Sequence, residues 1–566
     1  MIDYKVKADG VKYEKTEKGN VTQFNFEWER NKNKFIYISF SVPCIGIETV
    51  WEPTTLLNRP FNLSFASSAM GAVPLVCFLN ASGKSLYSFA LSDTVHQIDY
   101  SIAINEKTAE MDCTITMGLE QFGGKNNCSI EIMSNERETP VYEICENCEK
   151  WWSYFYNFNL NIPEEVYNPA YSTWYSYHHD FTADELLDEC KTAKQLGMDL
   201  LLVDSGWHNA DKSCGSKYSG DYNFAAEKIP DMREFAENVH KIGMKVILWY
   251  SVSFAGFESN IWNRFGDKTI GKYEDMGVGI LDPRYPEVRE HIIGRYVCAL
   301  KNWGIDGFKL DFIDSFRIKE DTLLKDGMDI CSIKEAVEKL LSDAMTRLRK
   351  IKPDVICELR QGYVGPNMRQ YATMFRAVDC PVNYRQNRIG TVDLRMLSGK
   401  TAVHSDMLMW NINEEAHIAA RQILNSIFSV LQISVKIETL PKEHFKMLKF
   451  WLDFARQNKD ILIHGRIMPE EENNFYPIVR AENNGEEIIA VYEINKVIET
   501  ENKKKITIIN ASDSENVFVD CANHYNYEIL DCTGNETESG YFSPTDSLVK
   551  INVPLSGLII LRKRSK

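Results

Sequence analysis

Short apolar segments alternate with amphipathic segments over residues 161–458, and this alternation constrains the fold more than any other feature. We interpret the apolar segments as strands at 171–177, 200–204, 245–250, 303–312, 355–359, 377–379, 401–404 and 433–437. Helices are predicted from Thr182, with Glu185 completing a capping box, and over 232–242, 287–303, 332–351, 392–397, 414–431 and 442–456. Eight strand–helix units in about 290 residues match a (β/α)8 barrel. The competing topology is an open doubly wound sheet. It would require a glycine-rich motif at its first turn, and none is visible.

Both flanks of this region have a different pattern. Residues 1–160 carry short segments with the two-residue period of strands, and helical periodicity is hard to find there. After residue 458 the helical pattern stops, and strands separated by Asn, Gly and Asp turns follow. We therefore predict an α/β fold: an N-terminal β-sandwich (1–160), a catalytic (β/α)8 barrel (161–458) and a small C-terminal β-sandwich (459–566).

Composition narrows the classes of partner. The net charge is −16 and the only Lys/Arg-rich run lies at 562–566, which argues against nucleic acid and anionic membranes. No apolar run approaches the about 20 residues of a membrane span, and no secretory signal is visible at Met1, so we expect a cytoplasmic protein. The 14 cysteines are scattered, and the single CxxC at Cys145 lacks a second pair. We expect reduced thiols, no metal and no cofactor. The sequence leaves open whether the protein forms a homo-oligomer.

The segment 303–312 places two charges on one face of a predicted strand. Phe308 and Leu310 alternate with Lys309 and Asp311, so both charged side chains point the same way. Buried charges are costly unless they have partners. In a barrel the C-terminal strand ends hold the active site, so a catalytic pair is one interpretation. A structural ion pair is the other, and this segment alone does not separate them.

Chemically unusual residues stand at most of the predicted strand ends. They are Asp204, Ser205, Trp207, Trp249, Lys309, Asp311, Arg360, Arg376, Asp379 and Asp406. Charged groups bind sugar hydroxyls, while aromatic rings stack on the apolar face of a sugar. Two carboxylates can then act as nucleophile and acid/base in glycoside cleavage. The pattern favours a carbohydrate site.

Five motifs together resemble a known family. They are Trp-Tyr-Ser-Tyr at 174–177, Leu-Val-Asp-Ser-Gly-Trp at 202–207, Leu-Asp-Pro at 281–283, Gly-Phe-Lys-Leu-Asp at 307–311 and Arg-Ala-Val-Asp at 376–379. In this order they resemble the α-galactosidase/raffinose-synthase clan of glycoside hydrolases, family thirty-six in particular. The resemblance covers the barrel, and the order of sandwich, barrel and sandwich is also similar. It implies a retaining, exo-acting α-glycosidase that needs no metal.

The resemblance also implies roles for individual residues. Asp311 is the expected nucleophile, and Asp379 is the expected general acid and then base. Asp311 beside Lys309 should stay ionised, whereas Asp379 needs a raised pKa to hold a proton, and nearby Arg376 opposes this. The remaining candidates are expected to bind or orient the sugar: Asp204 with Trp207 beside it, Ser205, Lys309, Arg376, Trp249, Arg360 and Asp406. Asp406 is also the reserve acid/base.

Ser205 departs from the pattern of the family, in which a second acid usually follows the first and grips the axial hydroxyls. Arg360 likewise stands where the family faces the 2-position of the sugar. The expected substrate is therefore an oligosaccharide or glycoside ending in an α-galactoside or a modified one. Alternatives are an α-N-acetylgalactosaminidase-like enzyme, an α-galactosyl transferase and a non-catalytic carbohydrate-binding protein.

Overall fold

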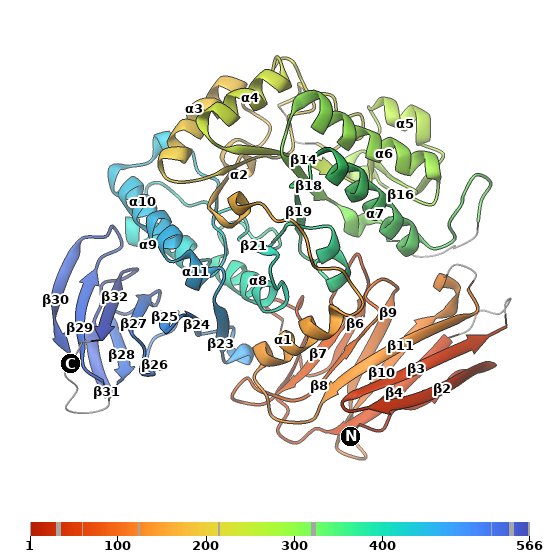
Figure 1. Cartoon of the computed structure of the whole chain (residues 1–566), viewed down its shortest axis with the longest axis horizontal. Helices are drawn as coiled ribbons and strands as arrows, with labels where there is room; N and C mark the ends of the chain where they lie inside the picture. The colour runs from red at the N-terminus through yellow and green to blue at the C-terminus, as the bar shows by residue number, and fades with distance from the viewer. Residues whose placement is uncertain are drawn as a thin grey trace.

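The computed structural model describes residues 2–29, 35–58, 60–122, 125–212, 215–317, 324–521, 523–542 and 548–563. Three regions follow one another along the chain (Figure 1). A β-sandwich, red to orange, is followed by a barrel, yellow to cyan, and by a smaller β region in blue. This architecture of a (β/α)8 barrel with flanking β domains confirms the predicted fold class. The exact domain boundaries at 160 and 458 stay a prediction.

The N-terminal region is a sandwich of two antiparallel sheets, and several of its strands bury every second residue. One sheet has the order β1-β4-β10-β9-β6 and the other β2-β3-β11-β8-β7-β5. The strands are β1 (Lys5–Lys7), β2 (Val11–Lys18), β3 (Val21–Trp28), β4 (Phe35–Pro43), β5 (Thr49–Trp51), β6 (Leu63–Ser67), β7 (Leu75–Leu79), β8 (Ser85–Leu91), β9 (Ile98–Asn105), β10 (Glu110–Gly118) and β11 (Asn127–Asn135). Along β4, Ile36, Ile38 and Phe40 point into the core between the sheets.

Helix α1 (Val141–Trp152) corrects the expectation that the first 160 residues lack a helix. Its buried residues, including Val141, Ile144, Cys145 and Cys148, recur at the three- and four-residue spacing of a helix face. The CxxC motif is part of this face. Cys145 and Cys148 are buried free thiols, as are most of the cysteines in the described ranges.

The central region is a barrel of eight parallel strands in the order β21-β20-β19-β18-β14-β13-β12-β22. They are β12 (Ala170–Ser172), β13 (Leu200–Val203), β14 (Lys245–Ser251), β18 (Gly307–Asp311), β19 (Ile356–Arg360), β20 (Met374–Arg376), β21 (Ala402–His404) and β22 (Gln432–Ile433). Parallel bridges from His404 to Val430 and from Leu408 to Ile433 connect the segments of β21 and β22, the two ends of this order, and so close the barrel. Seven of the eight predicted strand segments overlap these strands, although several boundaries differ, and the segment predicted at 377–379 lies just after β20.

Seven helices of the barrel coincide with predicted segments, although α8 begins well before 392 and α9 ends well before 431, and three short helices were not predicted. Together these helices are α2 (Trp174–Tyr177), α3 (Ala183–Gln195), α4 (Met232–Ile242), α5 (Asn260–Phe265), α6 (Pro286–Cys298), α7 (Ile333–Ile351), α8 (Tyr384–Leu397), α9 (Ala416–Leu424), α10 (Lys442–Gln457) and α11 (Lys459–Leu462). The capping box of Thr182 and Glu185 is present at the start of α3. Residues 174–177 are a helical turn and not the end of a strand. Strand β20 ends at Arg376, so Asp379 lies in the loop that follows.

The barrel interior is apolar at one end and polar at the other. Near the strand starts it is filled by an apolar cluster that includes Leu200, Leu202, Ile247, Ile356 and Met374. Nearer the C-terminal strand ends the buried side chains are charged or polar: Lys309, Glu358, Arg376, His404 and Gln432. The apolar layer closes the barrel below, so only the C-terminal end can open to a ligand.

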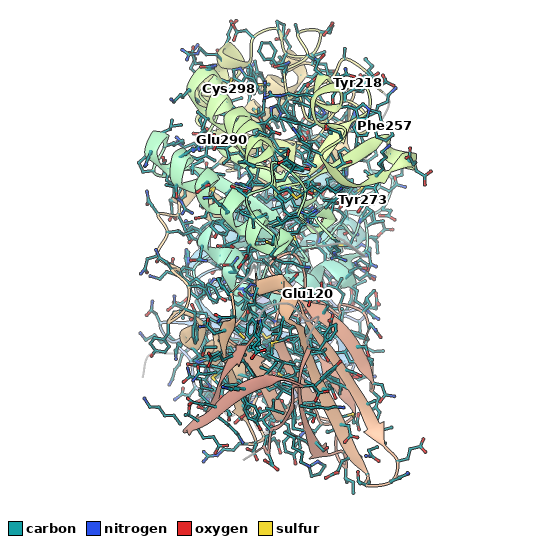
Figure 2. The ribbon with its side chains drawn as sticks, turned by 90° about the vertical axis from the view of Figure 1, so that its right-hand side faces the viewer. Glu120, Tyr218, Phe257, Tyr273, Glu290 and Cys298 are labelled. Carbon is teal, nitrogen blue, oxygen red and sulfur yellow. The ribbon has the colours of Figure 1, made fainter. Side chains whose placement is uncertain are left out.

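A small antiparallel sheet, ordered β15-β17-β16, lies between β14 and α6 in the sequence and was not predicted. Its strands are β15 (Phe254–Gly256), β16 (Thr269–Tyr273) and β17 (Val278–Leu281). In Figure 2, Phe257 and Tyr273 lie with Tyr218 on the upper right of the molecule, across from Glu290 and Cys298 of α6. We call residues 269–281 the rim hairpin. Short strands with Gly and charged residues gave no clear period in the sequence.

The C-terminal region is built from two sheets, of order β23-β24-β25-β27-β32-β29-β30 and β26-β28-β31. The strands are β23 (Arg466–Glu470), β24 (Ile478–Asn483), β25 (Glu486–Val491), β26 (Val497–Glu499), β27 (Lys505–Asn510), β28 (Asn516–Asp520), β29 (Tyr525–Leu530), β30 (Glu536–Phe542), β31 (Leu548–Asn552) and β32 (Leu558–Lys563). Part of their apolar side chains form a separate core, while others, such as Val479, Ala481 and Ile488, belong to the cluster shared with the barrel.

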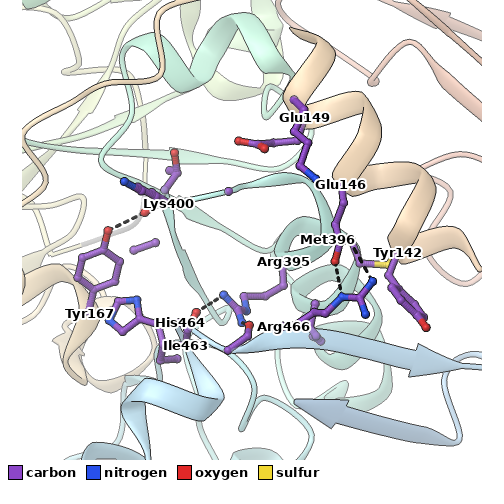
Figure 3. A pocket seen from close by; sticks show the side chains of 16 residues that line it. Tyr142, Glu146, Glu149, Tyr167, Arg395, Met396, Lys400, Ile463, His464 and Arg466 are labelled. Atoms are coloured by element: carbon purple, nitrogen blue, oxygen red, sulfur yellow. Dashed lines mark hydrogen bonds and ion pairs between the residues drawn. The ribbon is translucent and has the colours of Figure 1, made fainter. Parts of the chain in front are cut away.

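A cavity of 510 Å³ lies where α1, the start of β21 and the start of β23 meet (Figure 3). Arg466 bonds Glu146 across this inter-domain cavity at 2.7 Å, and the Tyr167 hydroxyl donates to the Lys400 carbonyl at 2.6 Å. Arg395 donates to the carbonyls of Leu462, Ile463 and Gly465. The cavity is at the strand-start end of the barrel. Its contacts join the three regions.

Candidate active site

A second cavity, of 580 Å³, opens at the C-terminal ends of the barrel strands, and we call it the strand-end cavity. Six of the ten residues predicted from the sequence line it: Asp204, Ser205, Trp249, Lys309, Asp311 and Asp379. They come from positions at or just after β13, β14, β18 and β20, which a parallel barrel brings to one end. Its volume lies in the range of small-ligand sites, about 300–1,000 Å³.

Asp311, the last residue of β18, accepts several hydrogen bonds. Arg360 Nε donates to Oδ1 at 2.6 Å, and the backbone N–H of Phe312 donates to the same oxygen at 2.8 Å. The Tyr363 hydroxyl lies 3.3 Å from Oδ1, and the Trp249 indole N–H donates to Oδ2 at 3.0 Å. Burial alone would raise the pKa of Asp311, but Arg360 and Lys309 outweigh it and hold the pKa far below its ordinary value.

The turn after β18 helps to present this carboxylate. Phe312 has a φ of 59°, in the left-handed region that side chains other than Gly seldom adopt. This conformation directs its N–H at Asp311 Oδ1. Strained backbone is frequent next to reacting groups, because the surrounding structure fixes them there.

Lys309 and Asp204 form a buried ion pair, with Nζ 2.6 Å from Oδ2. Burial alone would lower the pKa of Lys309, but the carboxylate of Asp204 raises it above its ordinary value. Asp204 also accepts the backbone N–H of Ser205 at Oδ1, at 2.8 Å. The two charges neutralise each other and still line the cavity, so they can donate to and accept from sugar hydroxyls.

Arg376 holds two carboxylates in fixed positions. Its Nη2 lies 2.7 Å from Asp379 Oδ1, and its Nη1 lies 2.5 Å from Asp406 Oδ1. The Asp379 side chain is 55% exposed, while Arg376 and Asp406 are fully buried. Burial would raise the pKa of Asp379, but Arg376 and then Lys309 lower it below its ordinary value. The free enzyme therefore does not hold Asp379 in the raised-pKa state that we expected of a general acid.

Four predicted residues lie outside the lining of the strand-end cavity. Trp207 is fully buried, and its indole N–H donates to the Trp249 carbonyl at 2.9 Å, so it packs beneath the site and does not line the cavity. Asp406 accepts from Arg376 and from the Tyr175 hydroxyl, and it lies behind Arg376 without lining the cavity. Arg376 contacts Asp379 and Arg360 contacts Asp311, and neither arginine lines the cavity itself.

The cavity also has walls that the sequence did not reveal. Trp174 and His179 line one side, and the rim hairpin adds Glu274 and Asp275. Trp174 belongs to the first motif at 174–177, so its ring could have been favoured as a platform. The rim residues gave no such signal, because nothing in their sequence shows that they reach the barrel end.

No cluster of three or more His, Cys, Asp and Glu suited to a metal ion exists among the described residues. Within the same ranges no helix has both the length and the apolar character to cross a bilayer.

The fold and the paired carboxylates of the strand-end cavity are those of a barrel glycoside hydrolase. Residues 168–465 match the Melibiase family model, which is more than half of the chain, and the chain belongs to this family. The alpha-galactosidase Mel36A of Lactobacillus acidophilus is 28% identical over 146 residues, 25% of this chain and 20% of that protein. The A type blood alpha-D-galactosamine galactosaminidase of Flavonifractor plautii is 20% identical over 174 residues, 27% of this chain and 15% of that protein.

Solved structures resemble the whole chain in fold. The GH36 alpha-galactosidase AgaA from Geobacillus stearothermophilus, in complex with raffinose, superposes with a TM-score of 0.66 at 12% identity. The superposition covers 98% of this chain and 81% of that one. The sequence matches to the curated relatives, in contrast, span a fifth or less of their length. The match in fold extends to the flanking β regions.

Proposed function

We propose that this protein is a retaining, exo-acting α-glycosidase that cleaves terminal α-galactosides through a covalent glycosyl-enzyme. One observation carries the proposal: Asp311 and Asp379 line the same cavity at the catalytic end of the barrel. Membership of the melibiase family and the names of the relatives support the choice of sugar. A dead barrel that only binds carbohydrate would have no need to keep both carboxylates.

In the proposed reaction Asp311 attacks the anomeric carbon while Asp379 protonates the departing oxygen. The low pKa of Asp311 keeps the nucleophile ionised at neutral pH. Water then attacks the same carbon, and Asp379, now a carboxylate, accepts its proton. Lys309 and Asp204 bind hydroxyls of the sugar, and the Trp249 ring is available for stacking.

A sugar with an amino group at the 2-position is the second candidate. The cavity is lined by five carboxylates (Asp204, Glu274, Asp275, Asp311 and Asp379) and by two lysines, Lys217 and Lys309. An excess of negative charge favours a neutral or cationic ligand. Ser205 also removes one acid from the expected galactose contacts. The galactosamine-cleaving relative from Flavonifractor plautii supports this alternative.

Aryl α-galactoside, α-galactosaminide, α-N-acetylgalactosaminide and α-glucoside, assayed side by side, test the proposal. We expect the α-galactoside to give the highest kcat/KM. A higher value for the galactosaminide would favour the second candidate. Absence of turnover with all four, at enzyme concentrations that would reveal slow hydrolysis, would refute the glycosidase assignment.

Asp311→Ala should abolish hydrolysis. Added azide should restore cleavage with the β-glycosyl azide as product, because the small anion attacks from the face that the carboxylate vacated. Asp379→Ala should lose about 10²–10⁴-fold on poor leaving groups and much less on activated aryl glycosides. Asp188→Ala, an exposed aspartate on α3, is the matched control and should behave as wild type. An unchanged rate in Asp311→Ala would remove this residue from the mechanism.

A further inference from the structure

Arg360, at the end of β19, is held on every side. Its Nε donates to Asp311 Oδ1 at 2.6 Å, and its Nη1 donates to the Gln361 carbonyl at 3.0 Å. Its two terminal nitrogens lie 3.4 and 3.3 Å from the oxygens of Asp314. The rings of Phe312 and Tyr363 flank the guanidinium, with centroids 5.5 and 5.4 Å away. A guanidinium fixed in this way has little freedom to turn toward a sugar.

The two oxygens of Asp311 therefore differ in their surroundings. Oδ1 accepts from the charged Arg360 and from the Phe312 N–H, and the Tyr363 hydroxyl is close to it. Oδ2 accepts only the neutral indole N–H of Trp249 among the described contacts. An oxygen already engaged by a cation and further donors has no lone pair free for attack. Oδ2 is the oxygen that remains available.

We propose that Arg360 is a positioning residue that makes Oδ2 of Asp311 the attacking atom and assists the return of the carboxylate in the second step. The inference rests on the proposed glycosidase function and deepens it. It replaces the expected role of Arg360 as a ligand of the sugar. Asp314 in turn keeps Arg360 in place.

The bonds formed and broken in the two steps show which step Arg360 accelerates. In the first step an Oδ2 lone pair forms the bond to the anomeric carbon, the bond to the leaving oxygen breaks, and Asp379 supplies its proton. In the second step a water oxygen bonds to that carbon and its proton goes to Asp379. The carbon–Oδ2 bond breaks with its electrons returning to Asp311. The ester is neutral and the carboxylate is charged, so Arg360 stabilises the carboxylate more and speeds the second step.

The test uses the full chain and an aryl glycoside with a good leaving group. Arg360→Met removes the charge and keeps the length, and its kcat should fall about 10- to 100-fold, the loss of a charged hydrogen bond. KM should fall in parallel, kcat/KM should change little, and a burst of aryl product should precede the steady state. Arg360→Lys should recover much of kcat. Arg562→Gln, at an exposed arginine of the C-terminal region, is the matched control.

A second variant keeps the inference testable where Arg360→Met does not fold. Asp314→Asn frees one side of Arg360 and should give a smaller burst and a smaller drop in kcat. The acid limb of the kcat/KM profile should move to higher pH in Arg360→Met, because Asp311 loses its cation. Equal losses in kcat and kcat/KM without a burst would overturn the positioning role alone. Wild-type enzyme that is inactive on all glycosides would overturn the proposed function and this inference together.

Discussion

Asp379 needs a proton in the first step and must lack one in the second, although Arg376 lies 2.7 Å from it throughout. In the free enzyme Arg376 and Lys309 prevail over burial, so the pKa of Asp379 is low. A bound sugar would cover this half-exposed carboxyl and raise its pKa by removing water. Once Asp311 is an ester, its negative charge is gone and the pKa of Asp379 falls again. The same residue thus suits both steps.

This reasoning predicts a separation between two pH profiles. Loss of the Asp379 proton should lower kcat/KM from a more acidic pH than it lowers kcat, because kcat/KM reports the free enzyme and kcat the complex. Steady-state kinetics on a glycoside with a poor leaving group measures both limbs. In Asp379→Ala the basic limb should vanish. Coincident limbs would show that the sugar does not change the pKa of this group.

Several residues of the site could be predicted because motifs mark them. Lys309 and Asp311 alternate with apolar residues on one strand, and Asp204 ends another, so barrel geometry alone brings them together. Trp207 ends the motif at 202–207 and Asp406 follows another strand end, yet neither lines the cavity. Sequence spacing gives the strand end, but the direction of a side chain in the loop beyond depends on contacts with distant segments, such as that of Asp406 with Tyr175.

Strand β18 is fixed at both of its ends by a buried aspartate. Asp311 is at its end, and Asp306 directly precedes it. Asp306 accepts the Val246 N–H at 2.9 Å and bonds His240 Nε2 at 2.7 Å, with Lys352 at 3.2 Å. Burial would raise the pKa of Asp306, but His240 and the Val246 N–H lower it below its ordinary value. The strand that carries the nucleophile is thereby anchored from the opposite end of the barrel.

Asp306→Ala should lower the free energy of unfolding by about 3 kcal/mol, because it leaves the partners of a buried charge unsatisfied. A lowered pKa means that this stabilisation is complete above the ordinary carboxyl pKa of about 4 and is lost as the pH falls through the folded-state value. Urea unfolding at pH 7 and at pH 3 measures it. The difference from wild type should shrink at pH 3, and an equal difference at both values would exclude the ionised carboxylate as its source.

At the level of elements, long helices were predicted best. Helix α4 has the predicted bounds, and Ser332 caps α7 as its position implied. Helix α1 was not predicted, because Cys145 and Cys148 were interpreted as a CxxC motif and not as apolar residues of a helix face. The strand predicted at 377–379 lies three residues earlier, since the apolar residues that pair with the barrel are Met374 and Phe375.

Contacts between the three regions stabilise the whole molecule. Around the inter-domain cavity these contacts differ in strength. Arg466 and Glu146 form a pair on side chains that are 41% and 37% exposed, and such pairs contribute about 0–1 kcal/mol. Among the described residues the partners of Arg395 are backbone carbonyls, and burial lowers its pKa to about 10, so it stays charged at neutral pH. It satisfies carbonyl acceptors at the end of α11 and just after it.

Arg395→Met should therefore destabilise the protein by about 3 kcal/mol, while Arg466→Ala should cost about 1 kcal/mol or less. Differential scanning calorimetry gives the unfolding temperatures, and limited proteolysis reports whether the chain is cut earlier near residues 458–466. Matching shifts for the two variants would show that the carbonyl contacts of Arg395 contribute no more than an exposed ion pair.

The rim hairpin borders the strand-end cavity, yet its strands pair only with one another and with β15 and are not part of the barrel sheet. Residues 274–277 therefore line the cavity from a sheet of their own, whereas Asp311 belongs to the barrel sheet. Natural drift or deliberate grafting can therefore exchange residues 269–281 and alter which leaving groups are accepted. The barrel strands that hold Asp311 would stay unchanged.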